Sequence, residues 1–350
     1  MDRITVNGST SYNVIIEHGI LDRVGSLMRD EIAGEKALIV TDSNVAALYL
    51  KTVNLSLRAA GYEVYSYTLE PGDQTKSLLS YIDILSVLAD KSFSGTDVIV
   101  ALGGGMIGDL AGFAGSTYKR GMRIAQIPTS LLAAVDASVG GKTAVNLPSG
   151  KNQVGTFCNP SIVICDPDVM HTLSDEDLHE GYAEIIKYGI LSGEAILNSL
   201  RKAVADGDYA DVIRRSVTIK RDVVQMDEKD KDFRQYLNLG HLVGHAIEAS
   251  SDYEISHGQA VAEGLAIEAR CAAMSGFIEM SSYLEITALL EEFNFGISKN
   301  YSWDELQPYL VRDKRLRDGC IDIILPYKVG QCYMRHLEAS RLHDYIQRGL

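Results

Sequence analysis

Three histidines and one glutamate in the second half of the chain form a pattern typical of metal ligands. His241 and His245 are four residues apart, which places both imidazoles on one face of a predicted helix. His257 follows His241 by sixteen residues, and Glu184 lies on an earlier predicted helix. Three such ligands with an open fourth position are typical of a catalytic Zn²⁺. The spacing leaves open which histidines bind, because one imidazole could be a ligand while its neighbour transfers protons.

A glycine-rich segment in the first half has the spacing of a nucleotide-binding loop. Gly103–Gly108 reads G-x-G-x-x-G, after a strand predicted over Asp97–Leu102 and before a helix predicted from Asp109. Small residues there let backbone N–H groups approach a pyrophosphate at a helix N-terminus. The acidic ribose ligand usual about 20 residues downstream is missing, but Asp42 ends an earlier predicted strand and could replace it. The pattern favours a nucleotide site over a turn that only packs a helix against a strand.

Several cationic residues lie in glycine-rich or polar turns rather than along helix faces. Lys187 follows Glu184 by three residues, and Arg234 and Asn238 lie within two turns before His241. A cation beside a metal site is unfavourable unless an anion lies between them. Each of these residues taken alone could be an ordinary surface ion pair. Together they predict an anionic substrate that is phosphorylated and carboxylated. The cations in turns are Arg120, Lys142 and Lys151.

The elements that must position these residues differ between the two halves of the chain. Strands are predicted over Lys36–Thr41, Tyr62–Leu69 and Asp97–Leu102, with an intervening helix over Ser77–Asp90. Alternation of strand and helix predicts a parallel α/β sheet. The expected apolar face of that helix contains Leu78, Leu79, Ile82, Leu85 and Leu88.

Beyond about residue 166 the periodicity becomes mostly helical. A strand or hairpin is expected over Cys320–Leu325, and a last helix from Ser340. We therefore predict an α/β domain over residues 1–165, a mostly helical domain over residues 166–350, and a site in the cleft between them. The predicted helices are Glu176–Ile190, Glu194–Ala205, Val212–Met226, Leu242–Ser250 and Gly258–Ser275.

The composition is that of a folded protein without the features of nucleic-acid or membrane proteins. The chain has 350 residues, of which 46% are hydrophobic, and its 33 Lys and Arg against 47 Asp and Glu give a net charge of −14. Such a charge repels polyanions and acidic membrane surfaces. The apolar runs are far shorter than the roughly 20 residues that span a bilayer, and the N-terminus lacks a signal or transit pattern. We therefore expect a cytoplasmic protein that binds neither nucleic acid nor membranes.

Most of the chain resembles one known family, 3-dehydroquinate synthase, within the sugar-phosphate cyclase group. The double-histidine block and the glycine-lysine block are more specific than the G-x-G-x-x-G match. The segments that carry the resemblance are Thr41–Val45, Glu70–Lys76, Gly103–Asp109, Tyr118–Gly121, Pro128–Ala133, Val135–Thr143, Gly150–Asn152, Gly181–Lys187, Leu237–His241, Gly244–Glu248, His257–Val261 and Asp313–Lys314.

The resemblance implies an N-terminal Rossmann-like domain, a mostly α-helical C-terminal domain, bound NAD, and Zn²⁺ or Co²⁺. It implies a lyase that converts 3-deoxy-D-arabino-heptulosonate 7-phosphate to 3-dehydroquinate and phosphate, in the shikimate pathway to chorismate and aromatic amino acids. NAD⁺ would oxidise the C5 alcohol, phosphate would leave by β-elimination, and the hydride would return to C5. Ring opening and an intramolecular aldol step would then close the carbocycle. A homodimer is also implied.

The family motifs assign a role to most of the candidate residues. The implied metal ligands are Glu184, His241 and His257, which leaves His245 for proton transfer near the substrate. The implied NAD contacts are Asp42, Asn44, Gly72, Asp73, Gln74, Thr75, Lys76, Gly105, Met106, Ile107, Gly108, Asp109, Thr129, Ser130, Lys142, Lys151 and Thr172. The implied substrate contacts are Arg120, Asp136, Lys142, Lys151, Asn152, Lys187, Lys220, Arg234, Asn238, His245 and Lys314.

Three positions depart from the common family pattern. Arg315 stands where a second lysine usually follows Lys314, so either residue could contact the substrate. Asp73 and Gln259 stand where glutamates are common, and we interpret both as tolerated changes.

Three other functions fit parts of the sequence. A metal-dependent polyol dehydrogenase shares the two-domain plan, but it has no need for many phosphate-binding cations. A sister cyclase acting on glucose 6-phosphate or sedoheptulose 7-phosphate lacks the substrate carboxylate that Arg234 and Asn238 would bind. A catalytically silent protein that only binds nucleotide and metal would not need candidate residues for each chemical step.

Overall fold

The β-branched runs of the first half form a seven-stranded sheet in the computed structural model, which describes residues 1–148, 150–297, 301–312, 315–316 and 318–350. The strand order is β1-β2-β9-β6-β5-β3-β4, and only the β1–β2 pair is antiparallel. The strands are β1 Asp2–Val6, β2 Tyr12–Ile16, β3 Lys36–Asp42, β4 Glu63–Leu69, β5 Val98–Gly103, β6 Arg123–Pro128 and β9 Ile162–Cys165.

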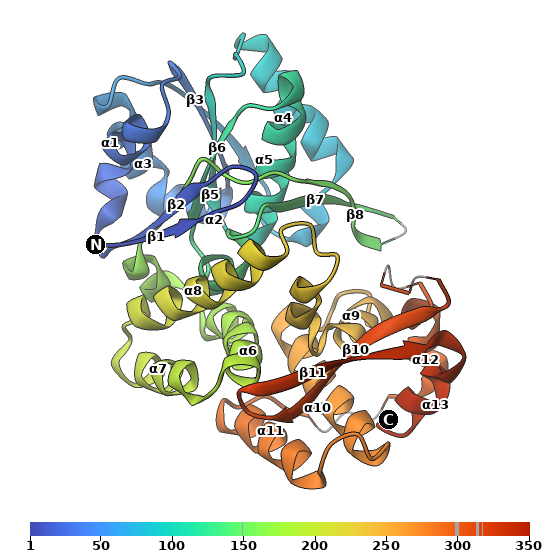
Figure 1. Cartoon of the computed structure of the whole chain (residues 1–350). Helices are drawn as coiled ribbons and strands as arrows, with labels where there is room; N and C mark the ends of the chain where they lie inside the picture. The colour runs from blue at the N-terminus through green and yellow to red at the C-terminus, as the bar shows by residue number, and fades with distance from the viewer. Residues whose placement is uncertain (149, 298–300, 313–314, 317) are drawn as a thin grey trace. The chain divides into compact units, whose positions relative to one another are not determined.

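The centre of this sheet is apolar on both faces. Every residue of β5 is buried, as expected for a parallel strand that elements cover on both sides. Helix α5 packs on β3, β5 and β6, and α4 packs on α5 and β4, where the two helices close one apolar core with the sheet (Figure 1). A hairpin, β7 Lys142–Leu147 and β8 Gly150–Phe157, packs against α5. The helices associated with the sheet are α1 Val24–Glu31, α2 Ser43–Val45, α3 Lys51–Ala59, α4 Leu78–Asp90, α5 Gly105–Thr117 and α8 Ala210–Met226.

The predicted parallel α/β class is confirmed, as are its three predicted strands, while two helical details differ from prediction. The helix after the glycine segment begins at Gly105 rather than Asp109, so most of the motif is helical. On α4, Leu79 and Ile82 are 75% and 52% exposed, whereas Ile84 and Leu88 are buried. The expected apolar face of α4 was therefore correct at Leu88 but wrong at Leu79 and Ile82, and it omitted Ile84.

The chain divides into two compact units, each with its own core. Unit 1 comprises Met1–Ser174 and Gly207–Lys229, and unit 2 comprises Asp175–Asp206 and Asp230–Leu350. The sequence predicted a single boundary after residue 165. In the structure α8 belongs to unit 1, where Lys220 of α8 binds the backbone oxygen of Asp136 at 2.6 Å.

Unit 2 is mostly helical, as predicted, and ends in a hairpin and a short helix. The predicted strand near Cys320 is the first strand of this hairpin. Among the described residues, no helix is both long and apolar enough to cross a bilayer. The elements of unit 2 are α6 Asp175–Ser192, α7 Glu194–Asp206, α9 His241–Ser250, α10 His257–Met274, α11 Met280–Glu292, α12 Trp303–Leu310, β10 Cys320–Lys328, β11 Gln331–Glu338 and α13 Leu342–Gln347.

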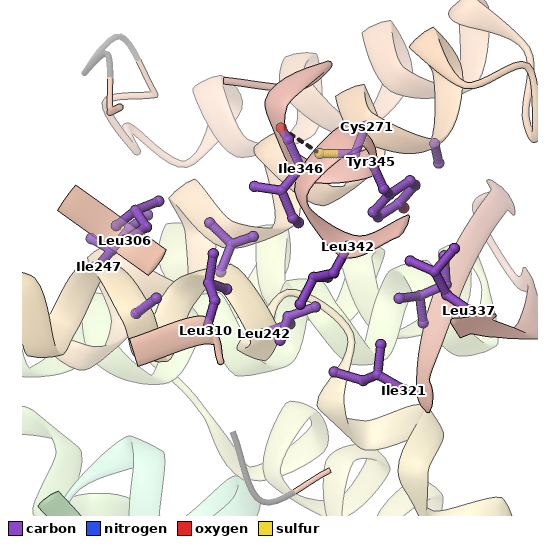
Figure 2. Close-up of a cluster of buried hydrophobic side chains, with 14 of the residues drawn as sticks. Leu242, Ile247, Cys271, Leu306, Leu310, Ile321, Leu337, Leu342, Tyr345 and Ile346 are labelled. Atoms are coloured by element: carbon purple, nitrogen blue, oxygen red, sulfur yellow. Dashed lines mark hydrogen bonds between the residues drawn. The ribbon is translucent and has the colours of Figure 1, made fainter. Parts of the chain in front are cut away.

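One apolar cluster packs α9 and α10 against the C-terminal elements of unit 2 (Figure 2). Leu242 and Ile247 of α9 and Cys271 of α10 contribute to it, and the Cys271 thiol donates a hydrogen bond to the backbone oxygen of Ile346 at 3.6 Å. Because the apolar side of α9 is buried here, its histidines occupy a different face of the helix. The remaining labelled side chains are Leu306, Leu310, Ile321, Leu337, Leu342 and Tyr345.

Candidate functional site

Three helices of unit 2 bring Glu184, His241 and His257 together. Glu184 lies in the middle of α6, while His241 and His257 are the first residues of α9 and α10. The Nε2 atoms of His241 and His257 lie 3.2 Å and 3.5 Å from Oε1 of Glu184. One ligand atom from each residue lies within 4.8 Å of the other two. The structure therefore gathers the three residues that the family resemblance implied as metal ligands.

Glycines set the approach of these helices. A Cβ on Gly264 would lie 2.0 Å from the backbone oxygen of Gly240 and 2.6 Å from the backbone nitrogen of Gly244. A Cβ on Gly258 would lie 2.6 Å from the Cα of Glu180. Such distances exclude any side chain, so α10 contacts the backbones of both α9 and α6. The three candidate ligands depend on this close packing because each lies within a few residues of a contact.

Hydrogen bonds on the far side of each imidazole favour the Nε2 atoms as the ligating nitrogens. Nδ1 of His241 lies 3.0 Å from the backbone oxygen of Leu239, and Nδ1 of His257 lies 3.4 Å from Oε2 of Glu248. An Nδ1–H that donates to these oxygens leaves the Nε2 lone pair directed at Glu184. This arrangement favours His241 and His257 as the candidate ligands, a point that the spacing left open.

His245 occupies a different place from the other two histidines. Its ring centroid lies 5.1 Å from that of His241 and 6.2 Å from that of His257, and the residue is exposed. It does not belong to the Glu184 group, although its ligand atom falls near those of Glu248 and His257 in a second group. An exposed imidazole beside two ligands is suited to transferring a proton.

The buried charges around Glu184 fit a divalent cation. Burial alone would raise the pKa of Glu184, but the Lys187 ammonium and the His241 imidazole outweigh it and hold that pKa well below its usual range. Burial would lower the pKa of His257, but the nearby carboxylates of Glu184 and Glu248 raise it to about 10. Among the described residues, neither Glu184 oxygen accepts a hydrogen bond of regular geometry. One carboxylate and two imidazoles are a donor set that Zn²⁺ and Co²⁺ accept.

The other substrate residues expected in unit 2 lie near these ligands in the chain. Lys187 is 2% exposed and forms an ion pair with Glu184 three residues before it on α6. Arg234, also buried, and Asn238 occupy the turn at 233–238, just before α9 begins. Nη1 of Arg315 donates to the backbone oxygen of Asn238 at 3.5 Å. Lys314 lies outside the described residues.

In unit 1, most of the expected NAD contacts follow the carboxyl ends of parallel strands. Asp42 ends β3, and its Oδ1 accepts hydrogen bonds from the backbone N–H groups of Asn44 and Val45, both at 3.0 Å. Thr129 follows β6 and donates its backbone N–H to the oxygen of Gly103 at the end of β5. The carboxyl ends of parallel strands meet at one edge of the sheet, where such folds bind nucleotides. Ser130 and Thr172 also follow β6 and β9 in the chain.

The glycine segment lies at this same edge. A Cβ on Gly103 would lie 2.6 Å from Cβ of Ile107, and one on Gly108 would lie 2.9 Å from Oε1 of Gln126 on β6. The glycines thus serve helix–strand packing, which the sequence offered as the alternative to a nucleotide site. The same turn also presents the N-terminus of α5, where backbone N–H groups and the helix dipole attract anions. Gly105, Met106, Ile107, Gly108 and Asp109 all belong to the first turns of α5.

The turn after β4 is joined to α5 and to the β7–β8 hairpin. Nζ of Lys76 lies 2.5 Å from Oδ2 of Asp109 and 2.5 Å from Oδ1 of Asn152. Nζ of Lys151 lies 3.0 Å from Oδ2 of Asp73. These contacts gather the expected residues of three segments in unit 1. The expected residues of this turn are Gly72, Asp73, Gln74, Thr75 and Lys76.

The remaining candidates of unit 1 are spread more widely. Lys220 forms an ion pair with Asp136 at 2.9 Å, and Lys142 begins β7. Arg120, in contrast, precedes β6, whereas Thr129 follows it. A six-residue strand spans about 20 Å, so Arg120 lies toward the opposite edge of the sheet from the expected NAD contacts. Unit 1 by itself does not bring Arg120 to them.

Sequence reasoning missed three buried or partly buried carboxylates that tie the ligand-bearing helices together. Oε2 of Glu180 on α6 accepts the backbone N–H of Gly258 at 2.8 Å. Glu268 on α10 accepts the backbone N–H groups of Gly240 and Val243, both at 3.0 Å. Glu248 on α9 contacts the His257 ring. Only Glu248 had a signal in the sequence, because it follows His241 by seven residues and so shares its helical face.

Comparison with known proteins assigns the whole central part of the chain to one family. A model described as 3-dehydroquinate synthase N-terminal matches residues 66–180, and a model described as 3-dehydroquinate synthase C-terminal matches residues 181–316. The chain is 38% identical over 348 residues to 3-dehydroquinate synthase of Streptococcus gordonii, covering 96% of this chain and 97% of that protein. It is 37% identical over 355 residues to 3-dehydroquinate synthase of Streptococcus suis, covering 99% of each.

Solved structures share the fold at lower identity. A 2-deoxy-scyllo-inosose synthase complexed with carbaglucose-6-phosphate, NAD⁺ and Co²⁺ matches with a TM-score of 0.84 and 22% identity over 100% of both chains. A 2-epi-5-epi-valiolone synthase from Streptomyces hygroscopicus with NAD⁺ and Zn²⁺ bound matches with a TM-score of 0.87 and 23% identity, covering 99% of this chain and 98% of that one. An iron-containing alcohol dehydrogenase has a TM-score of 0.66 and 14% identity over 99% of each chain.

Proposed function

The chain belongs to the 3-dehydroquinate synthase family, and we propose that it converts 3-deoxy-D-arabino-heptulosonate 7-phosphate to 3-dehydroquinate and phosphate. A small phosphorylated sugar is the substrate class consistent with this family. The observation that carries the proposal is the convergence of Glu184, His241 and His257 to within 4.8 Å of one another. Burying a carboxylate that faces two imidazoles is costly, and the fold alone does not require it.

Two cofactors complete the proposal. Glu184, His241 and His257 would hold Zn²⁺ or Co²⁺, which supplies a Lewis acid for an alcohol or carbonyl oxygen of the substrate when bound. The carboxyl edge of the unit 1 sheet would hold NAD, which supplies a reversible hydride acceptor when bound. Support for these assignments comes from the donor set in unit 2 and from the first turn of α5 in unit 1. Structural neighbours in complex with NAD⁺ and Co²⁺ or Zn²⁺ add to it.

The protein's own side chains would bind the anionic ends of the substrate and move protons. Arg234 offers a planar fork of donors, which suits the substrate carboxylate, with Asn238 as a second donor. Lys142, Lys151 and Lys187 would hold the phosphate and stabilise it as it leaves. His245 is exposed beside the two ligand histidines, where it could accept and return a proton.

Further contacts with the substrate are proposed for the polar residues that the family motifs match. These residues would orient the open-chain and ring forms so that the final aldol step closes the correct bond. They are Arg120, Asp136, Asn152, Lys220 and Lys314.

The two units would bind different cofactors. We assign NAD binding to unit 1, metal binding to unit 2, and substrate contacts to residues of both units. Support comes from the separate clustering of the two residue sets in the structure.

The expected homodimer is tested by light scattering during size-exclusion chromatography, where the mass of a single 38.3 kDa chain would contradict it.

One incubation tests the reaction itself. Purified protein is supplied with NAD⁺, Zn²⁺ and 3-deoxy-D-arabino-heptulosonate 7-phosphate, and inorganic phosphate and 3-dehydroquinate are measured together. We expect equal amounts of both products and no net NADH, since the hydride returns to the substrate. Steady NADH formation from a simple polyol, without phosphate release, would identify a dehydrogenase instead. Turnover of glucose 6-phosphate or sedoheptulose 7-phosphate alone would identify a different cyclase.

A further inference from the structure

Glu248 is a buried acidic residue beside the candidate metal ligands, and neither the motifs nor the comparisons give it a role. It is 4% exposed and lies on α9, seven residues after His241 and three after His245. Its Oε2 atom lies 3.4 Å from Nδ1 of His257, across the contact between α9 and α10. A buried carboxylate is costly unless it is paired or hydrogen-bonded, so its position requires an explanation.

The His257 ring can take two orientations, and a hydrogen bond with Glu248 favours one of them. The Nε2 atom of His257 faces Oε1 of Glu184 at 3.5 Å, while Nδ1 faces Glu248 on the opposite side. A half-turn of the ring would replace Nε2 with a carbon atom and remove the ligand from the site. An acceptor on the Nδ1 side makes the observed orientation favourable, because only a nitrogen can donate to it.

His257 depends on a side-chain acceptor, whereas His241 does not. The Nδ1 atom of His241 bonds to the backbone oxygen of Leu239 at 3.0 Å, and its side chain is only 11% exposed. The side chain of His257 is 29% exposed at the start of α10, so packing restrains its ring less. Glu248 therefore supplies for His257 what the main chain supplies for His241.

We propose that Glu248 is a positioning residue for the metal centre, which holds the Nδ1–H of His257 so that Nε2 stays directed at the ion beside Glu184. The inference rests on the proposed function, since it requires that Glu184, His241 and His257 bind a metal. Glu248 itself contacts neither the substrate nor the ion in this role.

A different role for the same carboxylate makes a different prediction. Ligand atoms of His245, Glu248 and His257 also lie within 4.8 Å of one another. If Glu248 were a ligand of a second ion there, the protein would bind two ions per chain and lose one when Glu248 is replaced. A positioning residue predicts one ion per chain, and a weaker affinity at an unchanged stoichiometry.

The experiment measures Zn²⁺ affinity of the metal-free protein by competition with a chromophoric chelator. We expect Glu248→Ala to weaken Zn²⁺ binding by about 10- to 100-fold, as loss of an outer hydrogen-bond partner does at other metal sites. Glu248→Asp should weaken it less, because the charge stays but no longer reaches His257. Glu248→Gln should weaken it least, since an amide oxygen can still accept the hydrogen bond.

Glu263→Ala is the matched control for Glu248→Ala. Glu263 is also a buried carboxylate on a ligand-bearing helix, at 6% exposure on α10, but it contacts Gln259 and Tyr301 rather than a ligand ring. Its replacement should leave Zn²⁺ affinity unchanged. An equal loss of Zn²⁺ affinity in this variant would show that removing any buried carboxylate on these helices weakens Zn²⁺ binding, and would overturn the assignment to Glu248.

The visible absorption of bound Co²⁺ distinguishes a positioning residue from one that only stabilises the fold. With Co²⁺ in place of Zn²⁺, the visible absorption of the Glu248→Ala complex should shift in position or intensity, because a tilted His257 ring changes the ligand field. Affinity within twofold of wild type together with an unchanged Co²⁺ spectrum would overturn the inference, and so would two ions per wild-type chain. A wild-type protein that binds neither ion would overturn the proposed metal site as well.

Discussion

The two units of the molecule assemble their candidate residues by different physical means. In unit 1, most of the expected NAD contacts follow the carboxyl ends of β3, β4, β5, β6 and β9, so the topology of the parallel sheet places them. In unit 2, the expected metal ligands come from α6, α9 and α10, whose contacts require glycine at Gly258 and Gly264. The first arrangement depends on the order of the strands, and the second on individual side chains.

The same contrast extends to charge. In unit 1, the side chains of the Lys151–Asp73 pair are 25% and 43% exposed, which is typical of a weak ion pair, and those of the more buried Lys76–Asp109 pair are 7% and 21% exposed. Lys187 and Glu184 of unit 2 are only 2% and 1% exposed, so water contributes almost nothing to their solvation. A buried charged group needs permanent partners, and a divalent ion would supply one. Unit 2 should therefore respond to single substitutions more sharply than unit 1.

The largest expected effect is at the metal ligands. Replacing His257 with alanine removes one of the three ligands, so Zn²⁺ affinity should fall by more than about 100-fold, beyond the loss expected for an outer hydrogen-bond partner. Phosphate release should fall to the level of the metal-free protein. Affinity is measured by chelator competition, and His336→Ala serves as the control because His336 of unit 2 has a side chain that is 68% exposed. A fully active His257→Ala variant after exhaustive chelation would contradict the ligand assignment.

A smaller but still large effect is expected where α9 and α10 touch. A Cβ at residue 264 would lie 2.0 Å from the Gly240 backbone oxygen, so Gly264→Ala must force the helices apart. Overpacking of this kind costs about 3 kcal/mol, and Zn²⁺ affinity should fall with it. Gly296→Ala is the control, since a Cβ there meets nothing within 4 Å. Equal thermal stability of the two variants would show that the glycine contact does not hold the site.

In unit 1, a substitution that causes no steric clash in the fold should weaken only the binding of NAD. A Cβ on Gly105 would lie 3.5 Å from Cβ of Ala137, an ordinary contact, so Gly105→Ala should fold normally. The added methyl group would hinder approach of the NAD phosphates to the first turn of α5. We expect about a tenfold loss of NAD affinity, or about 1.4 kcal/mol, with unchanged Zn²⁺ affinity. Calorimetric titration measures both, with Gly95→Ala as the control, and weaker Zn²⁺ binding would show that the two sites are coupled.

The sequence predicted the elements with a strong period, and it predicted one buried face only in part. The buried strand after Thr96 and the helices that carry Glu184, His241 and His257 occur where the periodicity placed them. On α4, however, two apolar stripes overlap, and nothing local decides which one meets the sheet. Ile84 and Leu88 are buried and Leu79 is exposed, because that choice depends on α5 and on strands from other parts of the chain.

The same limit explains the site residues that sequence reasoning did not find. The pattern of His241, His245 and His257 and the family motifs named a ligand set that the structure gathers. Glu180 and Glu268 bind backbone N–H groups of segments 78 and 28 residues away, and a backbone partner leaves no motif in the sequence. Such carboxylates can be recognised only when the helix contacts are known. In unit 2, such carboxylates help to position the candidate site residues, as the order of the strands does in unit 1.

The smallest expected effect tests the stability of the sheet in unit 1. Asp97 precedes β5 and accepts hydrogen bonds from the backbone N–H groups of Glu35, Lys36 and Ser94 at 2.7–3.0 Å. Burial alone would raise the pKa of Asp97, but these donors hold it below its usual range. Asp97→Asn keeps an acceptor but loses the charge, so we expect a loss of about 1 kcal/mol in the free energy of unfolding at neutral pH.

The pH dependence of that loss distinguishes a charge effect from a packing effect. Since the folded-state pKa of Asp97 is depressed, its charge contributes stability above the unfolded-state value near 4, and the contribution disappears as the pH falls through the folded-state pKa. The difference between wild type and Asp97→Asn should therefore be constant from pH 7 to about pH 5 and shrink in more acidic buffer. Urea unfolding at each pH measures it. A difference that stays the same in acid would mean that shape at this position matters and charge does not, and unit 1 would then resemble unit 2 in depending on the fit of one side chain.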